Sequence, residues 1–163
     1  MALDSSDAVR RAVTGFADLF GQRLRGCVVQ PMTPPGTELL IGITSEPVFG
    51  PLVAIGLGGT VTDLAADRAH RLVPVSVPDA EEMLTAFHAE ARIFDPRHCS
   101  ASVRRAVVDA LVRVGRLAEQ LSEVAELDIN PLVVGTDGCV AVDARIRVAP
   151  TSTADPALRA LGC

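Results

Sequence analysis

The stretch AELDINPLVVGTDGCVAVDARI, residues 125–146, decides the fold class of this chain. Two apolar runs flank a glycine-rich turn at residues 135–138, which predicts a β-hairpin with strands over residues 124–134 and 139–148. A hairpin needs no oxygen-bearing side chains, yet this one carries four, namely Glu126, Asp128, Asn130 and Asp143. Their presence raises the question of whether the hairpin binds a ligand.

Strand alternation predicts where the polar side chains of the first strand lie. Successive side chains point to opposite faces of a strand. Glu126, Asp128 and Asn130 therefore share one face, whereas Leu127 and Ile129 point into the core. The sequence thus predicts a polar face and an apolar face on the same strand.

Asn130 and Asp143 stand at similar distances from the turn, so the pairing predicts that they lie roughly opposite each other. One carboxylate and one amide oxygen on adjacent strands make an open oxygen site, which Mg²⁺ prefers when water and substrate phosphates complete its coordination. The alternative is a surface hairpin with solvated acids and an asparagine that satisfies the backbone before Pro131. Spacing alone leaves both interpretations open.

The rest of the chain predicts an α+β fold with a largely antiparallel sheet and flanking helices. Apolar residues at helical spacing, with caps, predict helices over residues 7–24, 78–92 and 100–121. Short apolar runs bounded by Gly and Pro predict further strands at residues 27–30, 38–44, 52–55, 60–65 and 71–75.

Composition excludes several classes of function. The net charge of −5 argues against a DNA-binding surface, and 3% aromatic residues give no stacking platform for single-stranded nucleic acid. No apolar run is long enough to cross a membrane, and four scattered cysteines without a CxxC motif predict reduced thiols in a cytoplasmic protein. A metal or nucleophile site at His98 and Cys99 is a weaker alternative to an ordinary loop there.

All 15 of the basic Lys and Arg positions are arginine, so the chain has no lysine. A site that needs a lysine as a mobile phosphate clamp, a Schiff-base amine or a general base cannot be completed by this chain.

A glycine-rich segment, Gly56-Leu57-Gly58-Gly59, follows the apolar run at residues 52–55. Adjacent glycines allow positive φ and let backbone N–H groups approach an anion closely. The segment matches neither the P-loop nor the dinucleotide-binding pattern. A tight turn without a ligand is therefore the alternative. Taken alone, Gln30 before Pro31 and Glu38 at a strand end point to no particular function.

Two longer motifs resemble the ATP-grasp domain of NDP-forming acyl-CoA synthetases, which are relatives of the succinyl-CoA synthetase β subunit. They are EPVFGP…GLGG within residues 46–59 and ELDINPL…VDAR within residues 126–145. The resemblance covers about residues 25–147. It implies an ATP-grasp C-terminal lobe over residues 25–149, preceded by a helix over residues 1–24 and followed by a mobile tail over residues 150–163.

The resemblance also implies roles for matching positions. The implied nucleotide contacts are Gln30, Met32, Glu38, Gly58 and Gly59, and the implied Mg²⁺ ligands are Asn130 and Asp143. In this family the hinge around residues 30–32 meets the adenine, the acidic residue lies at the nucleotide, and the glycines lie near the transferred phosphate. The implied cofactor is Mg²⁺ with ATP or ADP.

The chain departs from the family in what it lacks. The family carries phosphate-clamping lysines in a preceding lobe, and its CoA-binding domain and phosphorylated histidine are not matched here. We therefore expect a partial acid–thiol ligase, whose missing lobe and CoA-binding domain are supplied in cis or in trans. Such a piece is an excised fragment, a separately encoded subunit or a degenerate relative.

The alternative is a non-catalytic ATP-grasp module that serves as a nucleotide sensor or an interaction domain. The absence of lysine favours this alternative, whereas the retained Asn130 and Asp143 oppose it. An exposed apolar surface where the missing lobe should dock would favour homo-oligomerisation.

Overall fold

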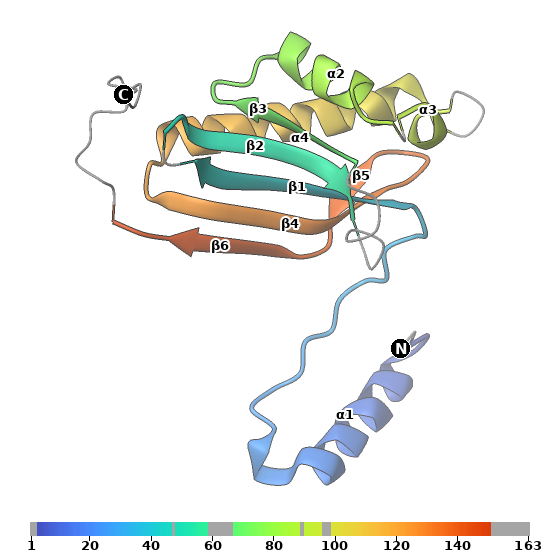
Figure 1. The fold of residues 1–163 in the computed structure, drawn as a ribbon. Helices are drawn as coiled ribbons and strands as arrows, with labels where there is room; N and C mark the ends of the chain where they lie inside the picture. Colours follow the sequence, from blue (N-terminus) through green and yellow to red (C-terminus); the bar gives the residue numbers. More distant parts are fainter. Residues whose placement is uncertain (1–2, 47, 59–66, 89, 96–98, 151–163) are drawn as a thin grey trace. The chain divides into compact units, whose positions relative to one another are not determined.

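The computed structural model describes residues 3–46, 48–58, 67–88, 90–95 and 99–150 (Figure 1). It divides the chain into two compact units, Met1–Pro34 and Pro35–Cys163, and each is described by itself. The strand predicted at residues 60–65 and most of the predicted tail lie outside the described residues.

The first unit contains the helix α1, Ser6–Phe20, and the short 3-10 helix η1, Gly21–Arg23. Ser5 caps α1, since its Oγ accepts a hydrogen bond from Ala8 N at 3.2 Å. The helix ends earlier than expected because Gly21 adopts a positive φ of 52°, which favours glycine.

The strand predicted at residues 27–30 is wrong, because residues 24–36 form neither helix nor strand. Val28 is 89% exposed and Val29 is 63% exposed. A strand needs a hydrogen-bonded neighbour, and the described part of the chain pairs none with this segment.

The second unit is built on a six-stranded sheet in which every pair is antiparallel. Its strands are β1 (Thr37–Glu46), β2 (Gly50–Leu57), β3 (Arg68–Leu72), β4 (Val124–Val134), β5 (Cys139–Ala141) and β6 (Ala144–Val148). The order is β3-β2-β1-β4-β5, and β6 also pairs with β4. The predicted α+β class with a largely antiparallel sheet is confirmed.

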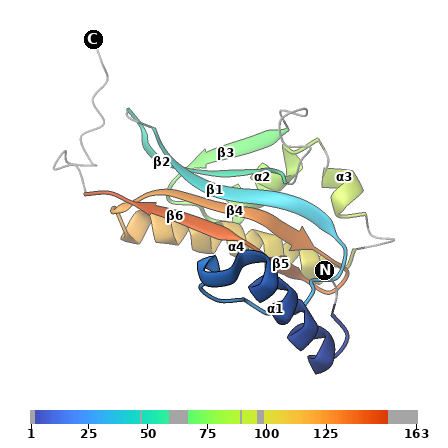
Figure 2. The same cartoon turned by 90° about the horizontal axis from the view of Figure 1, so that it is seen from below.

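Three helices lie on one face of this sheet, as Figures 1 and 2 show. They are α2 (Val77–Thr85), α3 (Glu90–Ile93) and α4 (Ala101–Gln120). The single helix predicted over residues 78–92 is wrong, because α2 ends at Thr85 and α3 starts afresh. Phe87 lies in the interruption and is only 2% exposed, so burial of its ring in the core prevails over helix continuity.

The core lies between the sheet and these helices, and it is aliphatic as expected. Alternate residues of β1 point into it, namely Leu39, Ile41 and Ile43, and α4 contributes Val103, Val107 and Leu111. All six are at most 2% exposed. The other face of the sheet is left uncovered by α2, α3 and α4 (Figure 2).

Arg104 of α4 joins the three helices through its charge. Its guanidinium donates to Glu81 of α2 at 2.8 Å and to Glu90 of α3, and it lies 5.4 Å from the ring centroid of Phe94. Desolvation disfavours the charged form, but the hydrogen bonds with Glu81 and Glu90 outweigh it and raise the pKa of Arg104. This arginine therefore stays charged and holds the helical layer together.

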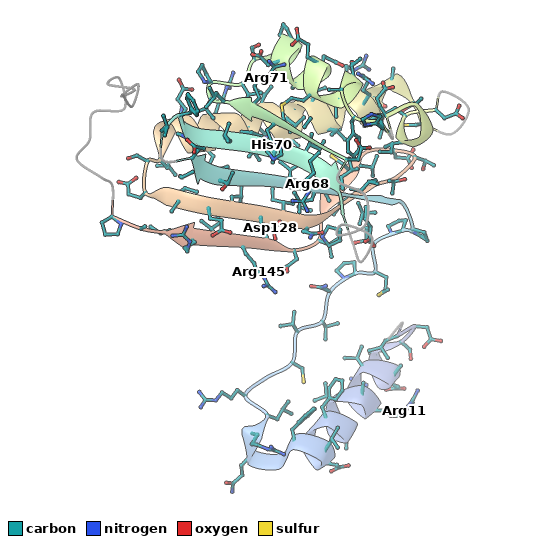
Figure 3. All side chains as sticks on the ribbon, in the orientation of Figure 1. Arg11, Arg68, His70, Arg71, Asp128 and Arg145 are labelled. Atoms are coloured by element: carbon teal, nitrogen blue, oxygen red, sulfur yellow. The ribbon has the colours of Figure 1, made fainter. Side chains whose placement is uncertain are left out.

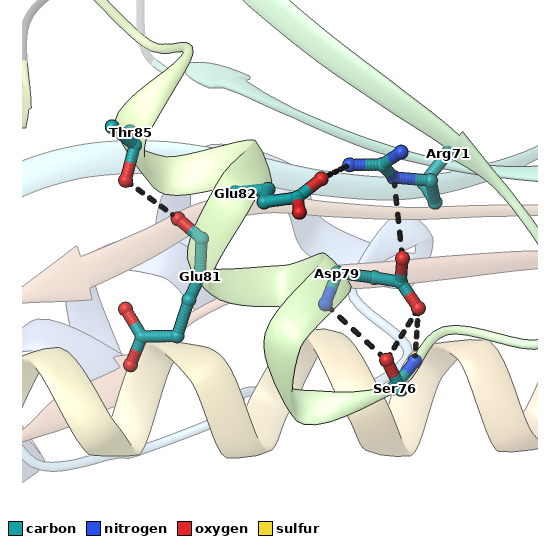
Figure 4. Close-up of polar contacts among 6 residues, drawn as sticks. All are labelled: Arg71, Ser76, Asp79, Glu81, Glu82 and Thr85. Carbon is teal, nitrogen blue, oxygen red and sulfur yellow. Dashed lines mark hydrogen bonds and ion pairs between the residues drawn. The ribbon is translucent and has the colours of Figure 1, made fainter.

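A second polar cluster forms where α2 begins (Figure 4). Ser76 caps the helix and accepts a hydrogen bond from Asp79 N at 3.3 Å, while Ser76 N donates to the Asp79 carboxylate at 3.0 Å. Arg71 of β3 pairs with Glu82 at 2.6 Å and lies 3.8 Å from Asp79. The cluster fastens α2 to the edge of the sheet.

Candidate functional site

The two strands of the C-terminal hairpin bring Asn130 and Asp143 together. β4 pairs with β6 along its first half and with β5 along its second half. At the junction Asn130 N donates to Asp143 O at 3.2 Å, and Val142 N donates to Pro131 O at 3.0 Å. The prediction that Asn130 and Asp143 lie opposite each other is confirmed.

The same junction carries a β-bulge. The pairing of β1 with β4 shifts register between Leu39 and Ile41, so Asn130 and Pro131 together face the single residue Leu40. Bulges bend a strand and re-aim its side chains, and they are common next to binding sites. The bulge therefore falls at the residue for which the sequence predicted a ligand role.

The amide oxygen of Asn130 reaches across β1 to Gly58 at the end of β2. A Cβ atom added to Gly58 would lie 3.2 Å from Asn130 Oδ1 and 2.7 Å from Leu39 O. Gly58 N donates to Glu38 O at 2.8 Å. The structure thus brings Glu38, Gly58, Asn130 and Asp143 to one corner of the sheet.

The remaining predicted contacts are not part of that corner. Gln30 and Met32 belong to the first unit, where Met32 is 68% exposed in a segment without helix or strand. Gly59 lies outside the described residues. Their proposed contacts with a nucleotide stay predictions.

The uncovered face of the sheet carries charged residues in register (Figure 3). One row runs across five strands through His70, Ala54, Gly42, Asp128 and Arg145. The neighbouring row holds Arg68, Gly56 and Leu40, and Asn130 continues it on β4. Nothing in the local sequence singled out Arg68 or His70, although their i, i+2 spacing on a strand places them on one face.

The oxygen donors at this corner suit a hard cation with few protein ligands. The side chain of Asp143 is 57% exposed, and its only ion pair within the described part of the chain is a loose one with Arg145 at 3.8 Å. Among the described residues no three His, Cys, Asp or Glu side chains converge as a metal site. One amide oxygen and one accessible carboxylate fit Mg²⁺, which keeps several waters and binds through one or two protein groups plus phosphates.

Two of the cysteines, Cys99 and Cys139, give no sign of a reactive thiol. Burial raises the pKa of Cys99, and burial together with the charge of Asp109 raises the pKa of Cys139. Both thiols therefore stay protonated at neutral pH and are poor nucleophiles. His98, the other half of the alternative site considered for Cys99, lies outside the described residues.

Comparison with known proteins identifies the class of this fold. A family model described as ATP-grasp domain matches residues 1–148, so the chain belongs to the ATP-grasp family. The match includes the N-terminal helix, which the motif resemblance did not cover. None of the helices among the described residues has the length and apolar character needed to cross a membrane.

Several of the relatives are ADP-forming acetate–CoA ligases. The β subunit of acetate–CoA ligase (ADP-forming) I of Pyrococcus furiosus is 37% identical over 123 residues, which are 76% of this chain and 53% of that protein. Acetate–CoA ligase (ADP-forming) I of Archaeoglobus fulgidus is 33% identical over 124 residues, which are 76% of this chain and 18% of that protein. The chain thus spans about half the length of the β subunits that it matches.

Solved structures agree with this class. The dinucleotide-forming acetyl-coenzyme A synthetase 1 of Ca. Korarchaeum cryptofilum, in complex with coenzyme A and Mg-AMPPCP, superposes with a TM-score of 0.78 at 34% identity. The superposition covers 91% of this chain and 67% of that chain. The resemblance to the ATP-grasp domain of these ligases is confirmed.

Proposed function

We propose that this chain supplies the Mg²⁺-nucleotide half-site of an ADP-forming acid–CoA ligase. The observation that carries the proposal is the meeting of Asn130, Asp143, Gly58 and Glu38 at one corner of an ATP-grasp sheet. The relative of known structure was solved with Mg-AMPPCP and coenzyme A, which supports a magnesium nucleotide as the ligand.

Each side chain has a proposed task at this half-site. Asn130 and Asp143 hold Mg²⁺ through their oxygens, and the ion neutralises phosphate charge and positions the transferred phosphoryl group. Gly58 and Gly59 let the backbone approach the phosphates, because neither carries a side chain. Glu38 orients the nucleotide, and residues 30–32 contact the adenine.

The chain performs only part of the overall reaction, acyl-CoA + ADP + phosphate ⇌ carboxylate + CoA + ATP. The lysine-bearing lobe and the CoA-binding domain come from elsewhere in cis or in trans. The matched relatives support this division. One is a separately named β subunit, and another is a longer chain in which the matched segment makes up only 18% of the length. A cytoplasmic location follows from the same proposal.

A second candidate is a non-catalytic ATP-grasp module that senses nucleotide or binds a partner. The complete absence of lysine favours it, because a ligase of this class needs a phosphate clamp. An assay with added partners distinguishes the two candidates. When the chain is mixed with a lysine-bearing ATP-grasp lobe and a CoA-binding subunit, only a ligase half-site supports ATP formation from acyl-CoA.

Calorimetric titration of Mg-ADP tests the half-site directly. We expect the wild-type chain to bind with a Kd below about 1 mM, which corresponds to about −4 kcal/mol. Asn130→Ala and Asp143→Ala should abolish this heat, and withdrawal of Mg²⁺ should weaken binding to the wild type. Asp137→Ala is the matched control, because Asp137 is an exposed carboxylate in the turn of the same hairpin.

A wild-type chain that releases no heat with Mg-ADP would overturn the proposal. Equal binding by the wild type and Asp143→Ala would overturn the assignment of the metal ligand. Circular dichroism of each variant checks that it keeps its fold, so that lost binding is not lost structure.

A further inference from the structure

Arg68 lies flat on the uncovered face of the sheet. It pairs with Gly56 across β3 and β2, and a Cβ atom added to Gly56 would lie 3.0 Å from Arg68 Cγ and 3.7 Å from Arg68 Cδ. The aliphatic part of Arg68 therefore occupies the space that a side chain at Gly56 would fill. Because β2 lies between β3 and β1, the first part of the Arg68 side chain leans from the edge strand over β2.

The row that begins at Arg68 ends at the proposed metal ligands. Gly56 pairs with Leu40 of β1, and Leu40 faces Asn130 and Pro131 of β4. Neighbouring strands are about 4.8 Å apart, so three spacings, about 14 Å, separate the backbones of Arg68 and Asn130. Arg68 and Asn130 thus stand at opposite ends of one row across four strands, with Gly56 and the half-buried Leu40 between them.

Arg68 also differs from the arginines Arg71 of β3 and Arg104 of α4 in its pairing. Arg71 is held by Asp79 and Glu82, and Arg104 is held by Glu81 and Glu90. Arg68 is exposed, and no carboxylate of the described residues lies within ion-pair distance of it.

The adjacent acid does not neutralise Arg68. The carboxylate of Asp67 accepts from the backbone N of His88 at 3.0 Å and lies 3.0 Å from its ring Nδ1. A guanidinium binds phosphate oxygens through two parallel hydrogen bonds. Arg68 is therefore a charged group with the right chemistry for phosphate and no acidic partner in the described part of the chain.

We propose that Arg68 binds the phosphate chain of the nucleotide, which lies between its guanidinium and the metal held by Asn130 and Asp143. Arg68 would thus supply from within this chain part of the positive charge that a lysine cannot supply here. The inference rests on the proposed function, because it needs a magnesium nucleotide at Asn130 and Asp143.

Titrations of the full chain with adenosine, Mg-ADP and Mg-ATP test the contact. Arg68→Ala should weaken Mg-ADP and Mg-ATP by about tenfold or more, because it removes charge-assisted hydrogen bonds to phosphate. Binding of adenosine should change less than about twofold, since adenosine has no phosphate for the guanidinium to bind. Arg68→Lys keeps the charge and should restore part of the affinity.

Arg116→Ala is the matched control, because Arg116 is an exposed arginine of α4 on the helical side of the sheet. It should bind all three ligands as the wild type does. Added salt should weaken Mg-ATP binding less in Arg68→Ala than in the wild type, because one screened charge pair is gone.

The outcomes separate this inference from the proposed function. If the wild type binds Mg-ADP and Arg68→Ala binds it equally well, the contact is refuted and the half-site stands. Equal weakening of adenosine and Mg-ADP would show a structural role and refute the contact as well. If the wild type binds no Mg-ADP, both the half-site and the role of Arg68 are overturned.

Discussion

Gly58 shows how a single hydrogen atom in place of a methyl group shapes the site. A Cβ atom added to this residue would lie 2.7 Å from Leu39 O, 2.8 Å from Leu39 C and 3.2 Å from Asn130 Oδ1. Backbone atoms of β1 cannot move aside as a flexible side chain can. The residue is therefore fixed by packing as well as by the proposed approach to phosphate.

Gly58→Ala should destabilise the fold by about 1–3 kcal/mol, because an added methyl group forces β1 or Asn130 to shift. Chemical denaturation measures the loss, and titration with Mg-ADP should show weaker binding in the same variant. Gly138→Ala is the control, since nothing lies within 4 Å of its added Cβ, and it should change stability by less than about 0.5 kcal/mol. Equal stability of the two variants would contradict the crowding at Gly58.

The sequence could predict part of this corner and not the rest. Asn130 and Asp143 stand at matching distances from one turn, so local strand pairing sufficed to place them opposite each other. The contact between Asn130 and Gly58 depends on how β4, β1 and β2 align, and those strands are distant in the sequence. No local pattern records that alignment.

At the scale of elements, the start of α2 depends on one capping serine. Ser76 donates to and accepts from Asp79 in a reciprocal capping box. The hydrogen bonds from the side chain and backbone of Ser76 lower the pKa of Asp79, against the effect of desolvation. A lowered pKa in the folded state means that the ionised carboxylate favours folding.

Ser76→Ala should cost about 1 kcal/mol at pH 7, because the helix loses its cap. The stabilisation by Asp79 is present above the unfolded pKa of about 3.8 and is lost as the pH falls through the lower folded value. The stability difference between wild type and Ser76→Ala should therefore shrink below about pH 4. Urea denaturation of both proteins at several pH values measures this difference in the free energy of unfolding.

Ser100→Ala is the control for the cap, since Ser100 precedes α4 without a side-chain capping bond. It should cost less than Ser76→Ala at pH 7. A stability difference for Ser76→Ala that stays constant down to about pH 3 would show that Asp79 does not depend on the serine.

Elements differ in how well their sequences revealed them. The apolar stripe of α4 and the alternation in β1 predicted both correctly, because the apolar face of each is buried, at Leu39, Ile41 and Ile43 in β1 and from Val103 to Ala118 in α4. The break between α2 and α3 was missed, because it serves the burial of Phe87 and leaves no Gly or Pro in the sequence. The absent strand at residues 27–30 had the right residue types and lacks a pairing partner among the described strands.

At the scale of the whole molecule, the core belongs to the second unit alone. Every member of the buried cluster lies within residues 39–139, and α1 has no buried residue. A chain that starts at Pro35 should therefore still unfold in one cooperative urea transition, because every residue of that cluster is present in it. Loss of the cooperative transition would show that the second unit cannot fold without residues 1–34.

The bulge at Asn130 and Pro131 makes β4 one residue longer than its packing requires. On the N-terminal side of the bulge, the side chains that pack on the core are Leu127 and Ile129, at odd positions. On its C-terminal side they are Leu132 and Val134, at even positions. A strand without the extra residue would keep both pairs facing the helices in the same register with β1. The packing of the core thus does not require the extra residue, and the bulge sets the position of Asn130 on the strand.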